Sequence, residues 1–214
     1  KDLDTTDKIA RDVLLNIKEK APKEIHGQLD DNIKWIEDAQ KNKLVVGSQA
    51  RILYADSQGR IEIAKAFNLA ISEGKIGPII LGRDHHDVSG TDSPYRETSN
   101  IYDGSKFTAD MAIHNVIGDS FRGATWVSIH NGGGVGWGEV INGGFGMLLD
   151  GTKKSEKKLK KMLFFDVNNG IARRSWARNE EAIFAIKKEM ARSQNLNVLI
   201  PENAEDEIID SLFK

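Results

Sequence analysis

The sequence contains no cysteine among its 214 residues. This absence excludes a disulfide framework, a cysteine nucleophile and a thiolate metal site within the chain. It also fits a reducing compartment, and we expect a cytoplasmic protein. The chain begins at Lys1 and shows no apolar signal region, so we expect it to be part of a longer protein.

Two further absences narrow the function classes. The sequence has no run of 18 apolar residues, so we predict no membrane span. It has no large excess of one charge either, because 30 basic and 32 acidic residues leave a net charge of −2. Nucleic-acid binding needs a clustered basic face, and this balance does not support it. The lysine-rich face of the helix expected at 155–165 is interpreted as a solvated face.

The apolar pattern predicts an α/β fold. Apolar residues at helical spacing, beginning with Ile9, Val13 and Ile17, predict an α-helical lead-in arm over residues 1–42. A strand, helix and strand between 51 and 82 predict a parallel pair with a right-handed crossover. Residues 43–214 are therefore expected to form an α/β catalytic-core domain, with a mixed, largely parallel sheet and helices on both faces.

Local signals place the turns and helix ends. Asp56 to Gly59 and Asn168-Asn169-Gly170 both have turn composition. Gly74 is expected to stop the helix before it, and Asn179 to cap a helix running to about Arg192.

Two loops that follow apolar runs hold the candidate chemistry, because α/β folds place ligands at the ends of buried strands. The first contains Asp84-His85-His86-Asp87. Histidine titrates near about pH 6.5, and a nearby carboxylate orients its ring, so the group could shuttle protons. The same side chains could instead cap a loop, or bind a metal ion, although adjacent strand residues point opposite ways. Arg96 could clamp a carboxylate or form a structural salt bridge.

The second loop is rich in glycine. It runs from His130 through Asn131 to Gly132, Gly133 and Gly134. Consecutive backbone N–H groups in such a loop can hold an anion or lie against a flat ring. The usual dinucleotide fingerprint is absent, because Gly134-Val135-Gly136 is not followed by a predicted helix. A tight structural turn would explain one or two glycines, but hardly three in succession.

Residues 82–98, 103–105 and 123–136 closely resemble the urocanase family, and the likeness extends from about Asp31 to Trp176. The match is to the C-terminal part of that enzyme, whose dinucleotide-binding domain lies upstream and is not in this chain. The resemblance implies a hydro-lyase that adds water to urocanate, giving imidazolonepropionate in histidine breakdown. It implies tightly bound NAD, used as an electrophile rather than as a hydride acceptor, and a homodimer.

The resemblance also implies roles for particular residues. Asp84, His85 and Asp87 would move protons, and Arg96 would position an anionic group such as the substrate carboxylate. Gly132, Gly133 and Gly134 would contact NAD, because a side chain at Gly134 would block close approach. These seven residues are the candidate catalytic and cofactor-binding residues, and no metal ligand is predicted.

One segment departs from the family pattern. Many bacterial urocanases carry a cysteine in Ala-Arg-Ile-Cys-Trp, whereas this chain has Leu53 in Ala50-Arg51-Ile52-Leu53-Tyr54. Leucine cannot act as a nucleophile, acid or base.

Two alternatives to the urocanase interpretation stay open at this point: an Asp/His metal-dependent hydrolase domain, and a non-catalytic interaction module. We expect the isolated chain to be inactive without the rest of its enzyme.

Overall fold

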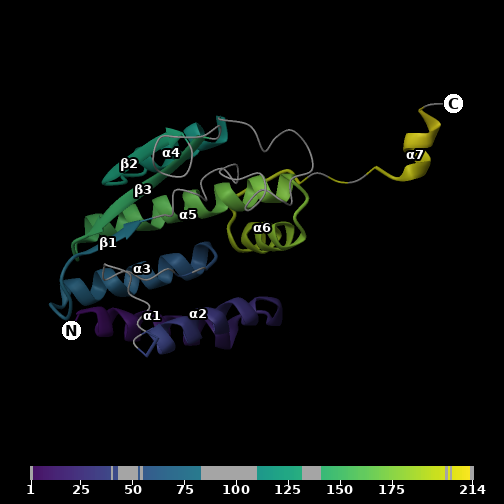
Figure 1. Ribbon diagram of the computed structural model, residues 1–214. Coiled ribbons are helices and arrows are strands. Elements are labelled where there is room, and N and C mark those ends of the chain that lie inside the picture. Colours follow the sequence, from purple (N-terminus) through teal and green to yellow (C-terminus); the bar gives the residue numbers. More distant parts are fainter. Residues whose placement is uncertain are drawn as a thin grey trace.

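The computed structural model describes residues 2–39, 41–42, 53, 55–82, 110–131, 141–200, 202 and 204–212. Helices predominate, and a small sheet lies beside them (Figure 1). The elements in chain order are α1 (Asp2–Lys20), a 3-10 turn (Lys23–Ile25), α2 (His26–Ala39), α3 (Ser57–Ser72), β1 (Ile79–Gly82), α4 (Asp110–Phe121), β2 (Trp126–Asn131), β3 (Ile141–Leu149), α5 (Lys153–Trp176), α6 (Glu180–Arg192) and α7 (Asp206–Ser211).

The predicted helical lead-in is confirmed as two helices, α1 and α2, which lie side by side next to α3 in Figure 1. Their apolar residues recur every three or four positions and face one core, which includes Leu14 of α1 and Ile33 of α2. Phe67 of α3 and Met162 of α5 belong to the same core. The helical pair is therefore packed into the main core, while the predicted boundary at 42/43 stays a prediction.

Helix α3 begins where a turn was predicted. The carboxylate of Asp56 accepts a hydrogen bond from the backbone N–H of Gly59 at 2.9 Å, which makes Asp56 the N-cap. The turn composition of 56–59 is therefore that of a helix start. The predicted helix end is confirmed, because Gly74 follows α3 with a φ of +70°.

The sheet differs from the predicted one. Its strand order is β1-β3-β2, and β3 pairs antiparallel with both neighbours. β1 and β2 run in the same direction, because each pairs antiparallel with β3. However, β3 lies between them, so the described residues contain no parallel pair. The strand predicted at 51–54 falls outside the described residues, except for Leu53.

The described helices cover one face of this sheet. Side chains alternate along β3, and Phe145, Met147 and Leu149 are buried in the core with α3 and α5. On the opposite face Leu148 and its cross-strand neighbour Ile80 are exposed, by 41% and 60%. Helices on both faces were predicted, and the described residues show them on one.

Helix α5 runs through a predicted turn. Asn168-Asn169-Gly170 has turn composition, yet α5 continues to Trp176. The reason is tertiary: Asn169 donates a hydrogen bond to the side-chain oxygen of Asn115 in α4 at 2.7 Å. Packing against a neighbouring helix outweighs the local preference of Asn and Gly for non-helical conformations, which is less than about 1 kcal/mol per residue.

The turn before α5 is a hydrogen-bonded cap. Oδ1 of Asp150 accepts from the backbone N–H of Thr152 at 3.0 Å, from its hydroxyl at 2.6 Å and from the Ser155 hydroxyl at 2.6 Å. Thr152 is the N-cap and accepts from the Ser155 N–H. The hydrogen bond from Ser155, followed by those from Thr152, lowers the pKa of Asp150 to about 2.

This cap predicts a pH dependence of stability. Because the folded-state pKa of Asp150 lies below its ordinary value of 3.8, the carboxylate stabilises the fold above about pH 4. That contribution is lost as the pH falls through about 2. In Asp150→Asn we expect lower stability than wild type at neutral pH and a shrinking difference between pH 4 and 2. Urea denaturation across this range measures it, and a constant difference between the two proteins would contradict the assignment.

Candidate functional site

The predicted site residues lie in two segments outside the described part of the chain. Asp84, His85, Asp87 and Arg96 fall within 83–109, and the three glycines fall within 132–140. The structure describes the elements to which both segments attach. Their catalytic and cofactor-binding roles therefore stay predictions.

Both segments leave the sheet in the same direction. β1 ends at Gly82, opposite Gly146 of β3, and β2 ends at Asn131, opposite Ile141. Since both strands pair antiparallel with β3, their carboxyl ends point toward the end of the sheet where β3 begins. The two exit points are separated by five residues of β3. At about 3.4 Å per residue, they lie about 17 Å apart along that strand. Both predicted loops therefore attach at the same end of the sheet.

Of the second motif, which begins at His130, the structure describes His130 and Asn131. His130 lies in β2 opposite Asn142 of β3, one residue before the strand ends. Alternation along β2 puts it on the same face as Ser128 and Trp126, away from Val127, which packs against the core. His130 is partly buried and close to the start of the glycine-rich segment.

A buried polar cluster fixes α4, the helix that connects the first predicted loop to β2. The Asn115 amide donates to Asp119 of α4 and to Asp166 of α5, both at 3.0 Å. Asn115, Asp119 and Asp166 are fully buried, and Asn169 donates back to the oxygen of Asn115. Hydrogen bonds among buried polar groups are costly to break, so they specify how α4 packs against α5.

Sequence reasoning missed this cluster. Its only signal is a pair of polar residues, Asn115 and Asp119, four positions apart between the apolar residues of an expected helix. Polar side chains at that spacing are usually solvated. We interpret Asn115 as a positioning residue, because it fixes the helix that lies between the two predicted loops.

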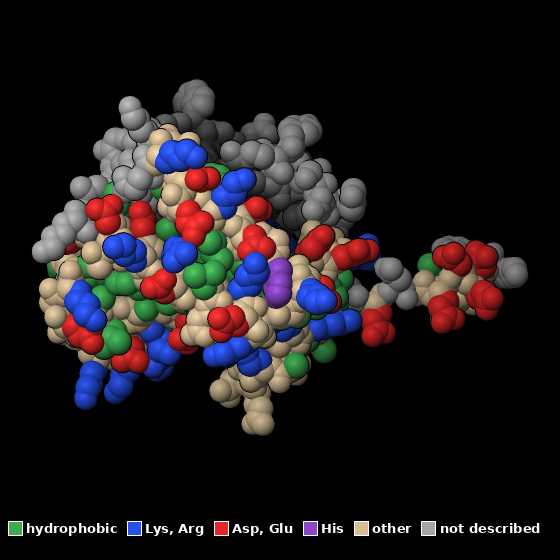
Figure 2. All heavy atoms as spheres, turned by 90° about the horizontal axis from the view of Figure 1, so that it is seen from below, with side chains coloured by type: hydrophobic (Ala, Val, Ile, Leu, Met, Phe, Trp, Pro, Cys, Tyr) green, Lys and Arg blue, Asp and Glu red, His purple; other side chains and the backbone are tan. Residues whose placement is uncertain are grey.

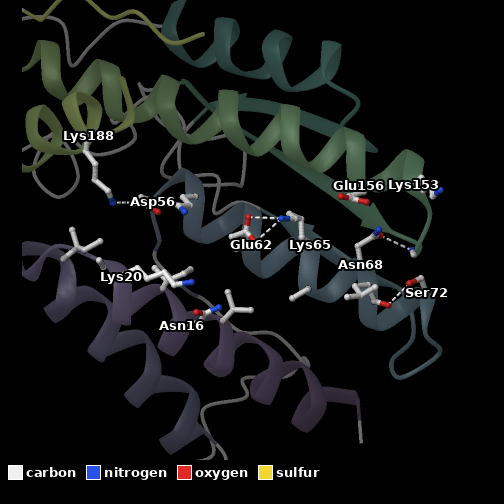
Figure 3. A pocket seen from close by; sticks show the side chains of 18 of the residues that line it. Asn16, Lys20, Asp56, Glu62, Lys65, Asn68, Ser72, Lys153, Glu156 and Lys188 are labelled. Carbon is white, nitrogen blue, oxygen red and sulfur yellow. Dashed lines mark hydrogen bonds and ion pairs between the residues drawn. The ribbon is translucent and has the colours of Figure 1, made fainter. Parts of the chain in front are cut away.

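A groove of about 790 Å³ lies elsewhere, between α1, α3 and the start of α5 (Figure 3). Its charged side chains are largely paired: Lys65 with Glu62 at 2.9 Å and Lys188 with Asp56 at 2.8 Å. No histidine lines it, and it includes none of the predicted site residues. Its chemistry is that of a solvated, charge-balanced surface rather than of a reaction centre.

The described residues show no grouping of three or more His, Asp or Glu side chains that could hold a metal ion. The segment from Asp84 to Asp87 lies outside the described residues. Among the described helices, none has the length and apolar composition needed to cross a bilayer.

Leu53, at the position of the bacterial cysteine, is partly buried and packs against the hydrophobic core. In this chain the position therefore contributes to packing rather than offering a reactive group.

The fold is a mixed helix-and-sheet unit in which two polar segments leave one end of a small antiparallel sheet. The Urocanase C-terminal domain model matches residues 1–188, and the chain belongs to this family. It is 58% identical over 215 residues to a probable urocanate hydratase of Dictyostelium discoideum, covering 99% of this chain and 32% of that protein. It is 57% identical over 208 residues to the urocanate hydratase of Mus musculus and 56% identical to that of Homo sapiens, covering 96% of this chain and 31% of each relative.

The chain thus spans about a third of the length of the curated relatives it matches.

Proposed function

We propose that this chain is the C-terminal catalytic-core segment of a urocanate hydratase. The enzyme would be a hydro-lyase that adds water to urocanate, giving imidazolonepropionate in histidine catabolism, in the cytoplasm and as a homodimer. The observation that carries the proposal is identity of 56–58% to proteins named urocanate hydratase, or probable urocanate hydratase, along almost the whole chain. Similarity at this level along almost the whole of this chain favours retention of the same reaction.

The proposed chemistry is divided between the two predicted loops. Asp84, His85 and Asp87 would move protons between water, the imidazole and the propenoate group of the substrate. Arg96 would hold the substrate carboxylate, because a guanidinium can donate two parallel hydrogen bonds to it. The strands that precede both segments support this division, since β1 and β2 end toward the same end of the sheet.

The glycine-rich segment would hold the cofactor. Backbone N–H groups of Gly132, Gly133 and Gly134 would lie against NAD, which when bound would supply the electrophile of the reaction. A few backbone contacts rarely provide enough free energy to offset the entropy lost on association. Other parts of the enzyme chain would therefore provide most of the affinity for NAD, and the 214-residue chain alone is expected to be inactive.

The test uses the complete enzyme that contains this segment. Incubation with urocanate is expected to reduce the ultraviolet absorbance of the conjugated substrate and to yield a product heavier by one water. The isolated chain is expected to give neither signal. The control is Asp31→Asn, an exposed carboxylate in α2 with no described partner, which should leave turnover unchanged. A complete enzyme that leaves urocanate unchanged, or that needs an added metal ion, would contradict the proposal.

A further inference from the structure

The outer face of the sheet, which the described helices leave uncovered, differs in chemistry from the helical surface. Figure 2 shows basic and acidic side chains intermixed over the helices at the bottom of Figure 1, as is typical of a solvated surface. An ion pair between Arg11 and Glu37 at 2.6 Å is one example. The outer face of the sheet instead presents apolar side chains, and Trp126 is 46% exposed there. The described part of this face is therefore accessible from solvent and carries little charge.

Strand β2 holds His130 on this outer face, near the end of the sheet to which both predicted loops attach. His130 pairs with Asn142 of β3, and Asn131 is the last residue of β2. The next residue of β2 on the same face, Ser128, lies opposite Gly144 of the central strand. Glycine inside a strand often marks a place where a ligand or another backbone approaches closely. The imidazole thus lies beside a position that suits close approach.

His130 is also close in the chain to the predicted cofactor contact. Gly132, the first of the three predicted glycines, follows two residues later, so the two Cα atoms can be at most about 7 Å apart. The side chain of His130 is partly buried. A strand holds a functional side chain more precisely than a loop does. His130 therefore combines a rigid backbone with nearness to the segment that would hold NAD.

The other two histidines that the structure describes have different surroundings. His26 begins α2, and its Nε2 lies 3.0 Å from the carbonyl oxygen of Ala21. His114 is exposed on α4, and its ring centre lies 6.0 Å from that of Phe165. Of the described histidines, His130 is the one that lies in the sheet.

The proposed reaction requires several proton transfers. It turns a propenoate into a propionate and a hydrogen-bearing ring carbon into a carbonyl carbon. The oxygen of water bonds to that ring carbon, and three protons leave, two from water and one from the ring carbon. The two side-chain carbons take up one proton each and a ring atom takes up the third, so no oxidant is needed. Because a general acid or base must lie within hydrogen-bond reach of its proton, we expect such groups from more than one element.

We propose that His130 is a further catalytic residue, which moves one of these three protons from the side of β2. The role rests on the function proposed above. Asp84, His85 and Asp87 would act from the segment that follows β1, and His130 acts from the strand that precedes the glycine-rich segment. Histidine titrates near about pH 6.5, so its imidazole can accept and return a proton at neutral pH.

Two substitutions in the complete enzyme test this role. His130→Gln keeps a side chain that forms hydrogen bonds but does not titrate. We expect it to lower kcat by about 100- to 10,000-fold and to remove one limb of the pH profile of kcat. Its NAD content and thermal unfolding midpoint should stay those of the wild type. In His130→Ala, added imidazole should raise turnover by at least about tenfold, because it can take the vacated place and move the proton.

The matched control is His114→Gln, which should leave kcat and its pH profile unchanged because His114 is exposed on α4. A wild-type complete enzyme that leaves urocanate unchanged would contradict the proposed function and this role together. If the wild type consumes urocanate and His130→Gln does so within about threefold, only the role of His130 is wrong. Loss of turnover with an unchanged pH profile, with loss of NAD, or without rescue by imidazole would make His130 a structural residue and overturn the proposal.

Discussion

Gly134→Val in the complete enzyme is expected to reduce turnover of urocanate by at least about a thousandfold and to abolish retention of NAD. Gly134 is predicted to contact the proposed NAD cofactor. A branched side chain there would occupy the space into which the nicotinamide must fit, and close approach of backbone to ligand is what glycine permits. A misplacement of about 1 Å at a reacting centre already costs about a hundredfold. The measurements are turnover and the NAD content of the purified protein.

The same substitution should leave the fold stable. The segment that contains Gly134 joins two strands that are already paired, from Trp126 opposite Gly146 to Asn131 opposite Ile141. Those pairings do not involve Gly134. The free energy of unfolding of the Val variant should therefore differ from that of the wild type by about 0.5 kcal/mol or less. Gly134→Ala, which adds one methyl group, should have a smaller effect on turnover. A Val variant that retains NAD and turns over normally would show that Gly134 does not contact the cofactor.

Helix ends were the part of the fold that local sequence predicted best. Asn179 does cap α6, accepting a hydrogen bond from the N–H of Ala182 at 2.8 Å. Gly74 does stop α3. Both signals act within three or four residues of chain, so they depend little on the rest of the structure.

Features that depend on distant residues were predicted less well. The pairing of β3 with both β1 and β2 brings together strands from different parts of the chain, and the apolar pattern of a strand does not specify its neighbours. Likewise, Asn168-Asn169-Gly170 has the composition of a turn until Asn115 is placed opposite it. Tertiary contacts decided both cases.

The candidate site shows the same contrast between what local sequence predicts and what depends on distant residues. Its residues were predicted from two long motifs, and the described strands agree in direction with a shared location for the loops. The buried cluster around Asn115 and Asp166 was missed because one helix alone gives no sign that its polar residues face another helix. Only the packing of α4 on α5 shows their role.

Gly151→Ala is expected to lower the free energy of unfolding by about 2 to 5 kcal/mol. Gly151 has a φ of +80°, which costs a residue with a Cβ about 1 to 2 kcal/mol. A Cβ there would also lie 2.8 Å from the backbone nitrogen and 2.9 Å from the Cα of Ser72. Those backbone atoms cannot rotate away, and overpacking typically costs about 1 to 3 kcal/mol. Urea denaturation followed by circular dichroism measures the change.

The contact is tight because α3 and the turn before α5 are tied together. Asn68 accepts from the N–H of Gly151 at 3.0 Å and donates to the carbonyl of Thr152 at 3.1 Å. A shift that relieved the overlap would therefore strain both hydrogen bonds, which contribute about 1 kcal/mol each.

Two other glycines separate the causes. Gly74 has a φ of +70°, and no atom lies within 4 Å of the place that a Cβ would take, so Gly74→Ala should cost only the conformational part, about 1 to 2 kcal/mol. Gly27 lies in α2 with no positive φ and equally open space, so Gly27→Ala should stabilise by about 0.5 to 1 kcal/mol. If Gly151→Ala and Gly74→Ala were equally destabilising, the overlap with Ser72 would contribute nothing, and the turn before α5 could move independently of α3.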